Sequence, residues 1–284
     1  MVRSTQESGW ISPCPEGRMS VMPKASEGRS SLWAQPTARF GGRAVLAAVA
    51  LALVAVPFSL TLLLVKESWG PLWRTDEAAR DGLHRYAVTH SGFVGAMQLI
   101  SDSGSGPAWI VVLGFVVVWL LWRRLPRLAL FVVITGVGSS VLNGVVKAAV
   151  NRLRPDLVDP VAQEQGLSFP SGHAQAAMVG YLVLLLVFLP VLRGAWRSIA
   201  KAFAVFMVLA IGFSRVALGV HFVSDVVGGF VLGAAWVAAM AAMFNALRVE
   251  RGRRPVDVRE ALEPEEAPRL AGRRSNDGEI DVAP

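Results

Sequence analysis

Length, composition and charge already exclude several classes of protein. Of the 284 residues, 53% are hydrophobic and 17% are charged, whereas soluble proteins average about 45–50% and about 25%. The net charge is +7, and a net positive charge is common in nucleic-acid-binding proteins. Whether it indicates nucleic-acid binding here depends on where the Lys and Arg residues lie. The single cysteine, Cys14, excludes an intramolecular disulfide and a zinc site built from several cysteines.

Apolar runs without charge follow the first 43 residues. They occur at 44–65, 107–122, 128–146, 174–192, 202–214 and 226–247. Since a bilayer-spanning helix needs roughly 20 apolar residues, four of these six runs are long enough, and the charge-free residues 104–106 are expected to extend the short run 107–122. The run 202–214 is short enough to be re-entrant or a buried core helix, but Lys201 and Arg215 at its ends favour a complete span. The sequence therefore predicts an all-α fold, an integral membrane bundle of six helices.

The first run, 44–65, also has features of a signal peptide, because Arg39 and Arg43 precede it. The hydrophobic part of a signal peptide has about 7–15 residues, whereas this run has 22 and is followed directly by Lys66. We therefore interpret it as an uncleaved anchor and as the start of a membrane domain that covers 44–247.

Two tails and the loops between the spans determine the expected topology. The tails, 1–43 and 248–284, lack any helical or alternating apolar period and are predicted to be disordered. Together with the loops 123–127 and 193–201 they carry 20 of the 28 Lys and Arg residues, and cytoplasmic segments are the ones enriched in these residues. We therefore expect a multi-pass protein of the cell membrane with both termini in the cytoplasm. Because topology accounts for most of the positive charge, nucleic acid is not expected as a partner.

The outer segment 67–106 contains a further helical pattern. A helix is expected from Thr75, with Asp76 and Glu77 in its first turn, where the helix dipole favours acids. Apolar residues recur at helical spacing between 93 and 100. We interpret the segment as an interfacial or lid element that lies against the bilayer and has a packing role rather than a site-forming one.

Small residues recur every four positions in two of the predicted spans. Gly136, Ser140 and Gly144 do so in the third span, and Gly229 and Gly233 do so in the sixth. Lipid provides no hydrophobic drive for helix association, so close approach of backbones at small residues holds membrane helices together. These two spans are therefore expected in the middle of the bundle.

Polar residues gather at the outward ends of the last four predicted spans. They are Lys147, Arg154, Ser171, Gly172, His173, Arg215, His221 and Asp225. Lys147 and Arg154 are seven residues apart, so they share a face if the helix continues to Pro155. Asp225 follows His221 by four residues at the start of the last span, where a carboxylate can accept the ring N–H and fix one tautomer.

The tripeptide Ser171-Gly172-His173 opens the fourth predicted span. A helix N-terminus has N–H groups that are free to bind an anion, and a glycine there admits close approach. The three cations of the polar set, placed around such a terminus, suit a phosphate dianion. The combination therefore predicts an anion site on the outer side of the membrane.

Other polar residues near this set receive a simpler interpretation. His84 and His90, in the outer segment, are assigned to solvated structure without specific partners. Asp156, Asp159 and Glu164 could neutralise the cations, but ordinary solvation of a loop is the expectation for them.

The polar set contains three motifs in chain order. They are Lys147-x6-Arg154-Pro155, Pro170-Ser171-Gly172-His173 and Ser214-Arg215-x5-His221-x3-Asp225. Together they resemble the three-part signature of the type 2 phosphatidic acid phosphatase (PAP2) family, also called lipid phosphate phosphatases, whose active site is similar to that of vanadium haloperoxidases and glucose-6-phosphatase. The resemblance covers about residues 60–247 and departs at Ala217, where many relatives carry a larger residue; this bears on substrate fit more than on chemistry.

The resemblance implies a membrane phosphatase that acts through a phosphohistidine intermediate. His221 would be the nucleophile, Asp225 would orient it, and His173 would protonate the leaving alkoxide and then activate water. The phosphoryl oxygens would be bound by Lys147, Arg154, Ser171, Gly172 and Arg215. The residues alone agree, because a neutral, oriented imidazole can attack near neutral pH and fixed cations stabilise charge on phosphorus, so no metal or other cofactor is expected.

Two other functions would use some of the same features. A lipid head-group transporter or flippase needs cations that bind an anion, but it does not need His173 together with the His221–Asp225 pair. A haloperoxidase would hold vanadate in the same place, but those enzymes are usually soluble. We therefore expect a lipid phosphate or diphosphate as the partner, of the undecaprenyl diphosphate or phosphatidic acid class, hydrolysed at the outer face among membrane lipids.

Overall fold

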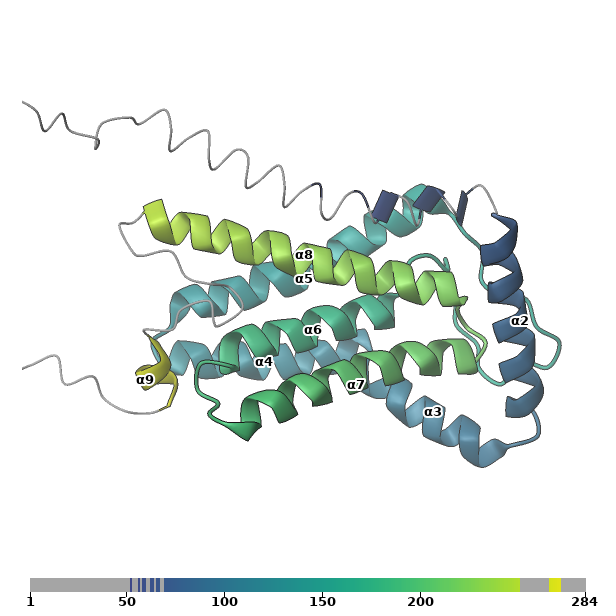
Figure 1. Ribbon diagram of the computed structural model, residues 1–284, viewed down its shortest axis with the longest axis horizontal. Helices are drawn as coiled ribbons and strands as arrows, with labels where there is room; N and C mark the ends of the chain where they lie inside the picture. The colour runs from purple at the N-terminus through teal and green to yellow at the C-terminus, as the bar shows by residue number, and fades with distance from the viewer. Residues whose placement is uncertain are drawn as a thin grey trace, which may run out of the picture. The chain divides into compact units, whose positions relative to one another are not determined.

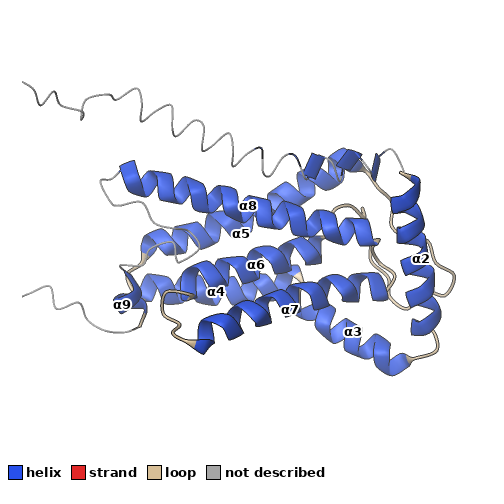
Figure 2. Cartoon of the chain, in the orientation of Figure 1, coloured by secondary structure: helices blue, strands red, loops and turns tan. Residues whose placement is uncertain are grey.

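Every element in the described part of the chain is a helix (Figure 2). The computed structural model describes residues 69–250 and 266–271, with scattered residues between 52 and 66. The helices are α2 Gly70–Ala87, α3 Ser91–Ser103, α4 Gly106–Trp122, α5 Pro126–Val150, α6 Gly172–Phe188, α7 Ala195–Ala217, α8 Val223–Glu250 and α9 Ala267–Leu270. The all-α prediction is confirmed over these ranges. The predicted tail 1–43, most of the run 44–65 and most of the tail 248–284 lie outside them.

Within the described residues, three helices, α5, α7 and α8, are long and apolar enough to cross a membrane. The weak run 202–214 lies within α7, which has 23 residues because the helix continues through charged residues at both ends. α3 and α4 pass the same test only together, as a pair bent by 41°. Of the residues 104–106 expected to extend run 107–122, only Gly106 belongs to α4. Ser105 is the cap at which α4 begins, and its side chain accepts a hydrogen bond from the N–H of Ala108. α6 is a shorter apolar helix of 17 residues, and the total of six crossings stays a prediction.

Large apolar side chains cover the outer faces of the long helices. Phe115 on α4, Val137 on α5 and Phe206 on α7 are 73%, 61% and 65% exposed. In water such surfaces cost free energy and lead to aggregation, whereas a bilayer solvates them. The outer faces therefore fit the membrane setting that composition predicts.

Helix α6 lies at the centre of the bundle, where it packs against α4, α5, α7 and α8 (Figure 1). The contact with α8 depends on two glycines, because a Cβ on Gly229 would lie 2.7 Å from the carbonyl oxygen of Ser171 and one on Gly233 would lie 3.1 Å from that of Gln175. The predicted small-residue contact of α8 is thus confirmed. Along α5 the prediction holds for Gly136 alone, where a Cβ would lie 3.3 Å from the Leu113 side chain of α4. Ser140 and Gly144 are exposed, and it is Gly138 that packs against α8, at the side chain of Trp236.

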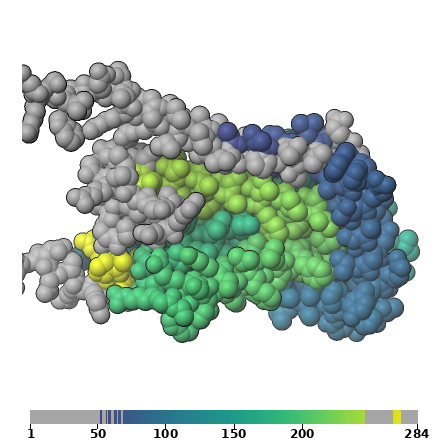
Figure 3. Space-filling view, in the orientation of Figure 1, coloured from purple at the N-terminus to yellow at the C-terminus, as the bar shows by residue number. Residues whose placement is uncertain are grey.

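Helix α2 crosses one end of the bundle and contacts α7 and α8 (Figure 1). In the space-filling view it forms the outer surface at that end (Figure 3). The loop 151–171, which joins α5 to α6, and the turn between α7 and α8 lie at the same end. All of the motif residues are carried by these two connections and by the helix ends beside them.

A short helix occurs within the C-terminal segment that the sequence predicts to be disordered. Ala267–Leu270 forms α9, and Leu270 is only 3% exposed within a cluster that includes Leu120 and Leu128. Pro268 in the first turn is already restricted to helical φ, and burial of Leu270 stabilises the turn further. This stretch therefore differs from the disordered tail expected for 248–284.

Candidate active site

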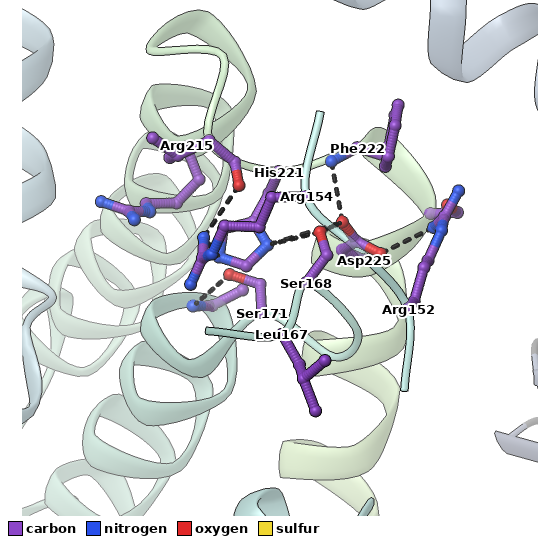
Figure 4. Close-up of polar contacts among 12 residues, drawn as sticks. Arg152, Arg154, Leu167, Ser168, Ser171, Arg215, His221, Phe222 and Asp225 are labelled. Atoms are coloured by element: carbon purple, nitrogen blue, oxygen red, sulfur yellow. Dashed lines mark hydrogen bonds and ion pairs between the residues drawn. The ribbon is translucent and has the colours of Figure 1, made fainter. Parts of the chain in front are cut away.

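His221 lies in the turn between α7 and α8, with 1% of its surface exposed. Its Nε2 is 3.1 Å from Nη1 of Arg154, and a guanidinium can only donate hydrogen bonds. Nε2 must therefore be the acceptor, which assigns the ring proton to Nδ1. Nδ1 faces Oδ2 of Asp225 at 3.5 Å and Oγ of Ser168 at 3.4 Å (Figure 4). Burial lowers the pKa of His221 to about 4, so the ring is neutral at pH 7 with its free electron pair on Nε2.

Asp225 is held by several donors at once. The N–H of Phe222 donates to Oδ2 at 2.8 Å, Oγ of Ser168 donates to the same oxygen in a short bond, and Nη1 of Arg152 donates to Oδ1 at 2.6 Å. The bond to Phe222 is the one that an acid in the first turn makes to the N–H of the residue before the helix. With 0% exposure and these partners, the carboxylate has one orientation, toward His221.

Arg154 lies in the loop after α5, and the structure corrects the expectation that it shares a helical face with Lys147. α5 ends at Val150, and Asn151 follows in the left-handed conformation with φ of 53°, so the chain turns away three residues before the arginine. Arg154 instead donates to the carbonyl oxygens of Gly166 at 3.2 Å and Val220 at 2.8 Å. The guanidinium thus joins the loop to the turn that carries His221.

The N-terminus of α6 faces this turn, as the sequence predicts. Ser171 is the residue before the helix, and its N–H donates to the carbonyl oxygen of Asp225 at 3.0 Å. Gly172 and His173 form the first turn of α6, and the His173 side chain stays 21% exposed. Lys147 donates from Nζ to the carbonyl oxygen of Leu167 at 2.9 Å. The structure therefore brings His173, Ser171 and Lys147 to the same end of the bundle as His221.

Glu164 binds two of the predicted phosphate-binding residues. Its carboxylate is 3.0 Å from Nη2 of Arg154 and forms a shorter ion pair with Arg215, and it lies 4.0 Å from Nδ1 of His173. Burial raises the pKa of Glu164, but the charge of Arg215 and those of His173 and Arg154 lower it by more, so the group is ionised at neutral pH. The expectation that Glu164 is merely solvated is wrong. A carboxylate occupies the cationic cluster formed by Lys147, Arg154 and Arg215.

Arg215 is positioned from a second helix. It lies at the end of α7 and is 3% exposed, and its Nη1 donates to Oγ of Ser101 on α3 at 2.6 Å. Its Nε is buried with no hydrogen-bond partner among the described residues.

Sequence reasoning missed other residues around the site. Ser168 and Arg152 both bind Asp225, and the signal for Arg152 was its place two residues before Arg154 in the loop that follows α5. His84, expected to have no specific partner, has Nε2 2.9 Å from the carbonyl oxygen of Val158. It therefore links α2 to the loop 151–171.

Comparison with known proteins gives this arrangement a family. Residues 127–248 match the profile of the PAP2 superfamily. The chain is also 31% identical over 129 residues to a decaprenylphosphoryl-5-phosphoribose phosphatase of Mycobacterium tuberculosis, a match that covers 43% of this chain and 67% of the relative. The chain belongs to the PAP2 superfamily. All residues of the three motifs lie within the matched region.

The matches to other PAP2 proteins cover different shares of those proteins. Phosphatidylglycerophosphatase B of Bacillus subtilis is 45% identical over 95 residues, a match that covers 32% of this chain but only 46% of that protein. The chain thus spans about half the length of this curated relative. The crystal structure of a transmembrane PAP2-type phosphatidylglycerolphosphate phosphatase from Bacillus subtilis has a TM-score of 0.57 and 27% identity, covering 71% of this chain and 98% of that one. The helical membrane fold is therefore that of a PAP2 protein.

Proposed function

We propose that this PAP2 protein hydrolyses a lipid phosphate or diphosphate by way of a phosphohistidine at His221. The observation that carries the proposal is the state of that side chain. Its Nε2 electron pair points at a guanidinium, at 3.1 Å from Arg154, and its Nδ1 faces a buried carboxylate. An imidazole in this state is a nucleophile whose target is an anion bound by the same guanidinium.

The reaction follows from the order of groups around His221. Nε2 forms a bond to phosphorus while the bond from phosphorus to the lipid oxygen breaks, and His173 donates a proton to that oxygen. A water molecule then attacks phosphorus, His173 takes a proton from the water, and the phosphorus–nitrogen bond breaks to release phosphate. Arg154, Arg215 and Lys147 neutralise the phosphoryl oxygens in both steps, which is the type of electrostatic stabilisation that contributes most in such reactions.

The substrate class follows from where the site lies. The site is at one end of the bundle, beside helices whose outer faces are apolar, so a phosphate in water can reach it while its lipid tail stays among membrane lipids. Two related proteins are named for phosphatidylglycerophosphate and for undecaprenyl diphosphate. We infer one of these two chemistries, phosphatidic acid and phosphatidylglycerol phosphate or undecaprenyl diphosphate, as the substrate.

The decisive experiment measures phosphate release from a panel of these lipids in detergent micelles. We expect turnover by the wild type, turnover that EDTA leaves unchanged, and loss of at least about 10³-fold in kcat for His221→Asn, since nucleophile removal disables the chemical step. His90→Asn is the matched control, because His90 stacks on Tyr86 outside the site. A His221→Asn variant with wild-type turnover would refute the proposal.

The side of the membrane on which the site lies is a separate part of the proposal. The distribution of Lys and Arg supports a topology with both termini in the cytoplasm and the site outside. Since Cys14 is the single cysteine, a membrane-impermeant maleimide should label it only after cells are permeabilised. In a Cys14→Ser background, Asp159→Cys in the exposed loop should be labelled in intact cells. The reverse pattern would place the site in the cytoplasm.

A further inference from the structure

Helix α2 contributes a buried carboxylate to the site end of the bundle. Asp76 lies within this helix and is 0% exposed, whereas the sequence pattern places it in the first turn of a helix that begins at Thr75. Oδ1 accepts a hydrogen bond from the N–H of Ser224 at 2.9 Å, and Oδ2 accepts one from the Ser224 hydroxyl. Asp76 therefore binds the first turn of α8, directly beside Asp225.

Arg152 connects this carboxylate to the one that faces His221. Nη2 donates to Oδ2 of Asp76 at 3.0 Å, and Nη1 donates to Oδ1 of Asp225 at 2.6 Å. Figure 4 shows the guanidinium on the side of Asp225 that faces away from His221. The three residues form a chain of alternating charge, Asp76–Arg152–Asp225, that ends at the nucleophile.

Phe222 ties the same helix to the backbone that holds Asp225. Its ring lies 4.3 Å from Cζ of Arg152 and 5.8 Å from the ring of Trp73 on α2. Its N–H is the donor to Oδ2 of Asp225. α2 thus contacts the turn between α7 and α8 through an aromatic ring as well as through a carboxylate.

The charges of this chain suit the proposed reaction. Bond formation at Nε2 places positive charge on the His221 ring, which a carboxylate at Nδ1 stabilises. If Arg152 were bound to Asp225 and to no other acid, its positive charge would cancel the negative charge of that carboxylate. Because Asp76 binds the other side of the same guanidinium, the three groups keep one net negative charge, and Asp225 remains an effective partner for a cationic ring.

We propose that Asp76 and Arg152 are positioning residues, which act through Asp225 on His221 and make α2 part of the active site. The proposal rests on the proposed function, in which His221 forms a bond to phosphorus. It goes beyond the three motifs, since Asp76 lies outside all of them.

Asp76→Asn is the most informative variant, because it removes the charge while the amide oxygen can still accept the hydrogen bond from the Ser224 N–H. We expect kcat on phosphatidic acid to fall about 10-fold, which corresponds to about 1.4 kcal/mol of lost transition-state stabilisation. KM should stay within about twofold, since the cationic cluster is unchanged. Asp81→Asn is the matched control, because it removes the same charge from an exposed position of α2.

A binding measurement separates positioning from loss of folded protein. Orthovanadate accepts a fifth ligand and can bond to Nε2, whereas inorganic phosphate is bound by the cations alone. Calorimetry of Asp76→Asn should show about 10-fold weaker vanadate binding and phosphate binding within about twofold of the wild type. In an Arg152→Gln background, the Asp76→Asn change should have no further effect on vanadate affinity.

The possible outcomes each have a distinct meaning. Wild-type vanadate affinity in Asp76→Asn, with or without a fall in kcat, would overturn the inference, because the carboxylate would then only hold α2 in place. Equal weakening of vanadate and phosphate would overturn it as well. If the wild type hydrolyses none of the lipids but Asp76→Asn still weakens vanadate binding selectively, the proposed function fails while the positioning role stands.

Discussion

Glu164 gives the most direct prediction, because its carboxylate occupies the place proposed for the substrate phosphate. It pairs with Arg154 at 3.0 Å and with Arg215, and both guanidiniums have to release it before they can bind phosphoryl oxygens. Glu164→Gln removes the competing charge and keeps the size of the side chain. We therefore expect the variant to bind inorganic phosphate more tightly than the wild type.

The magnitude follows from the two ion pairs. Fully exposed pairs contribute about 0.2–1 kcal/mol, and hydrogen bonds to buried charged groups about 1.5–3 kcal/mol. Glu164 is 29% exposed, which places each pair near about 1 kcal/mol and both together near about 2 kcal/mol. Since about 1.4 kcal/mol is tenfold in affinity, and glutamine keeps part of the hydrogen bonding, phosphate should bind roughly 10-fold more tightly.

Calorimetry with inorganic phosphate between pH 6 and pH 8 measures this gain. The Arg215, His173 and Arg154 charges hold the pKa of Glu164 below its ordinary value, so the carboxylate stays ionised throughout this range and the gain should not vary with its titration. Asp156→Asn, which removes a charge from an exposed position in the same loop, is the control and should leave the affinity unchanged. Unchanged or weaker phosphate binding by Glu164→Gln would refute the reasoning, since the carboxylate would then support the site rather than compete for it.

Three further changes test other parts of the geometry. Gly229→Ala places a methyl group 2.7 Å from the Ser171 carbonyl oxygen and should cost about 1–3 kcal/mol of stability. Gly144→Ala is the control and should cost none, because a methyl group there meets nothing within 4 Å. Equal unfolding temperatures for the two variants would contradict the packing described. Because the pKa of His221 is lowered to about 4 in the folded protein and is about 6.5 in an unfolded chain, the unfolded state binds more protons between these values and wild-type stability falls as the pH drops through this window. His221→Asn lacks this loss and should gain about 2 kcal/mol relative to the wild type between pH 7 and pH 5 in denaturant titrations; parallel pH curves would exclude a buried neutral ring. Arg154→Lys should lower kcat about 100-fold in the phosphate-release assay. A guanidinium can donate to the Val220 carbonyl oxygen and to a phosphoryl group at the same time, whereas an ammonium lacks this forked geometry. Wild-type turnover by the variant would show that Arg154 has no role in the reaction.

The motif residues were predictable because their positions depend on local rules. Ser171 caps α6, as a serine before an apolar run does, and Asp225 reaches His221 because four residues separate them. Gly229 and Gly233 lie at a helix contact, as their spacing indicates. In each case the partner is near in sequence, or the contact needs only small size.

Residues whose role depends on distant partners were not predictable in the same way. Asp76 is separated from Ser224 by 148 positions, and nothing local distinguishes it from an exposed acid at a helix start. Arg154 leaves the helical face of Lys147 because Asn151 adopts the left-handed conformation and ends α5, which a spacing argument does not include. Glu164 looks like a loop acid until the fold brings it to Arg154 and Arg215.

Most of the Lys and Arg residues lie outside the site, yet the site itself contains several. The total charge of the site explains why they are needed. The charged groups are Lys147, Arg152, Arg154, Arg215, Asp76, Glu164 and Asp225. Four cations and three carboxylates leave one positive charge while Glu164 is bound. If a phosphate dianion replaces Glu164, the site becomes neutral. A buried cluster is stable only when its charges are nearly balanced, and both states satisfy this condition. If Glu164 left before phosphate was bound, the site would carry two uncompensated positive charges. Direct replacement of Glu164 by phosphate is therefore favoured over departure of Glu164 from an empty site.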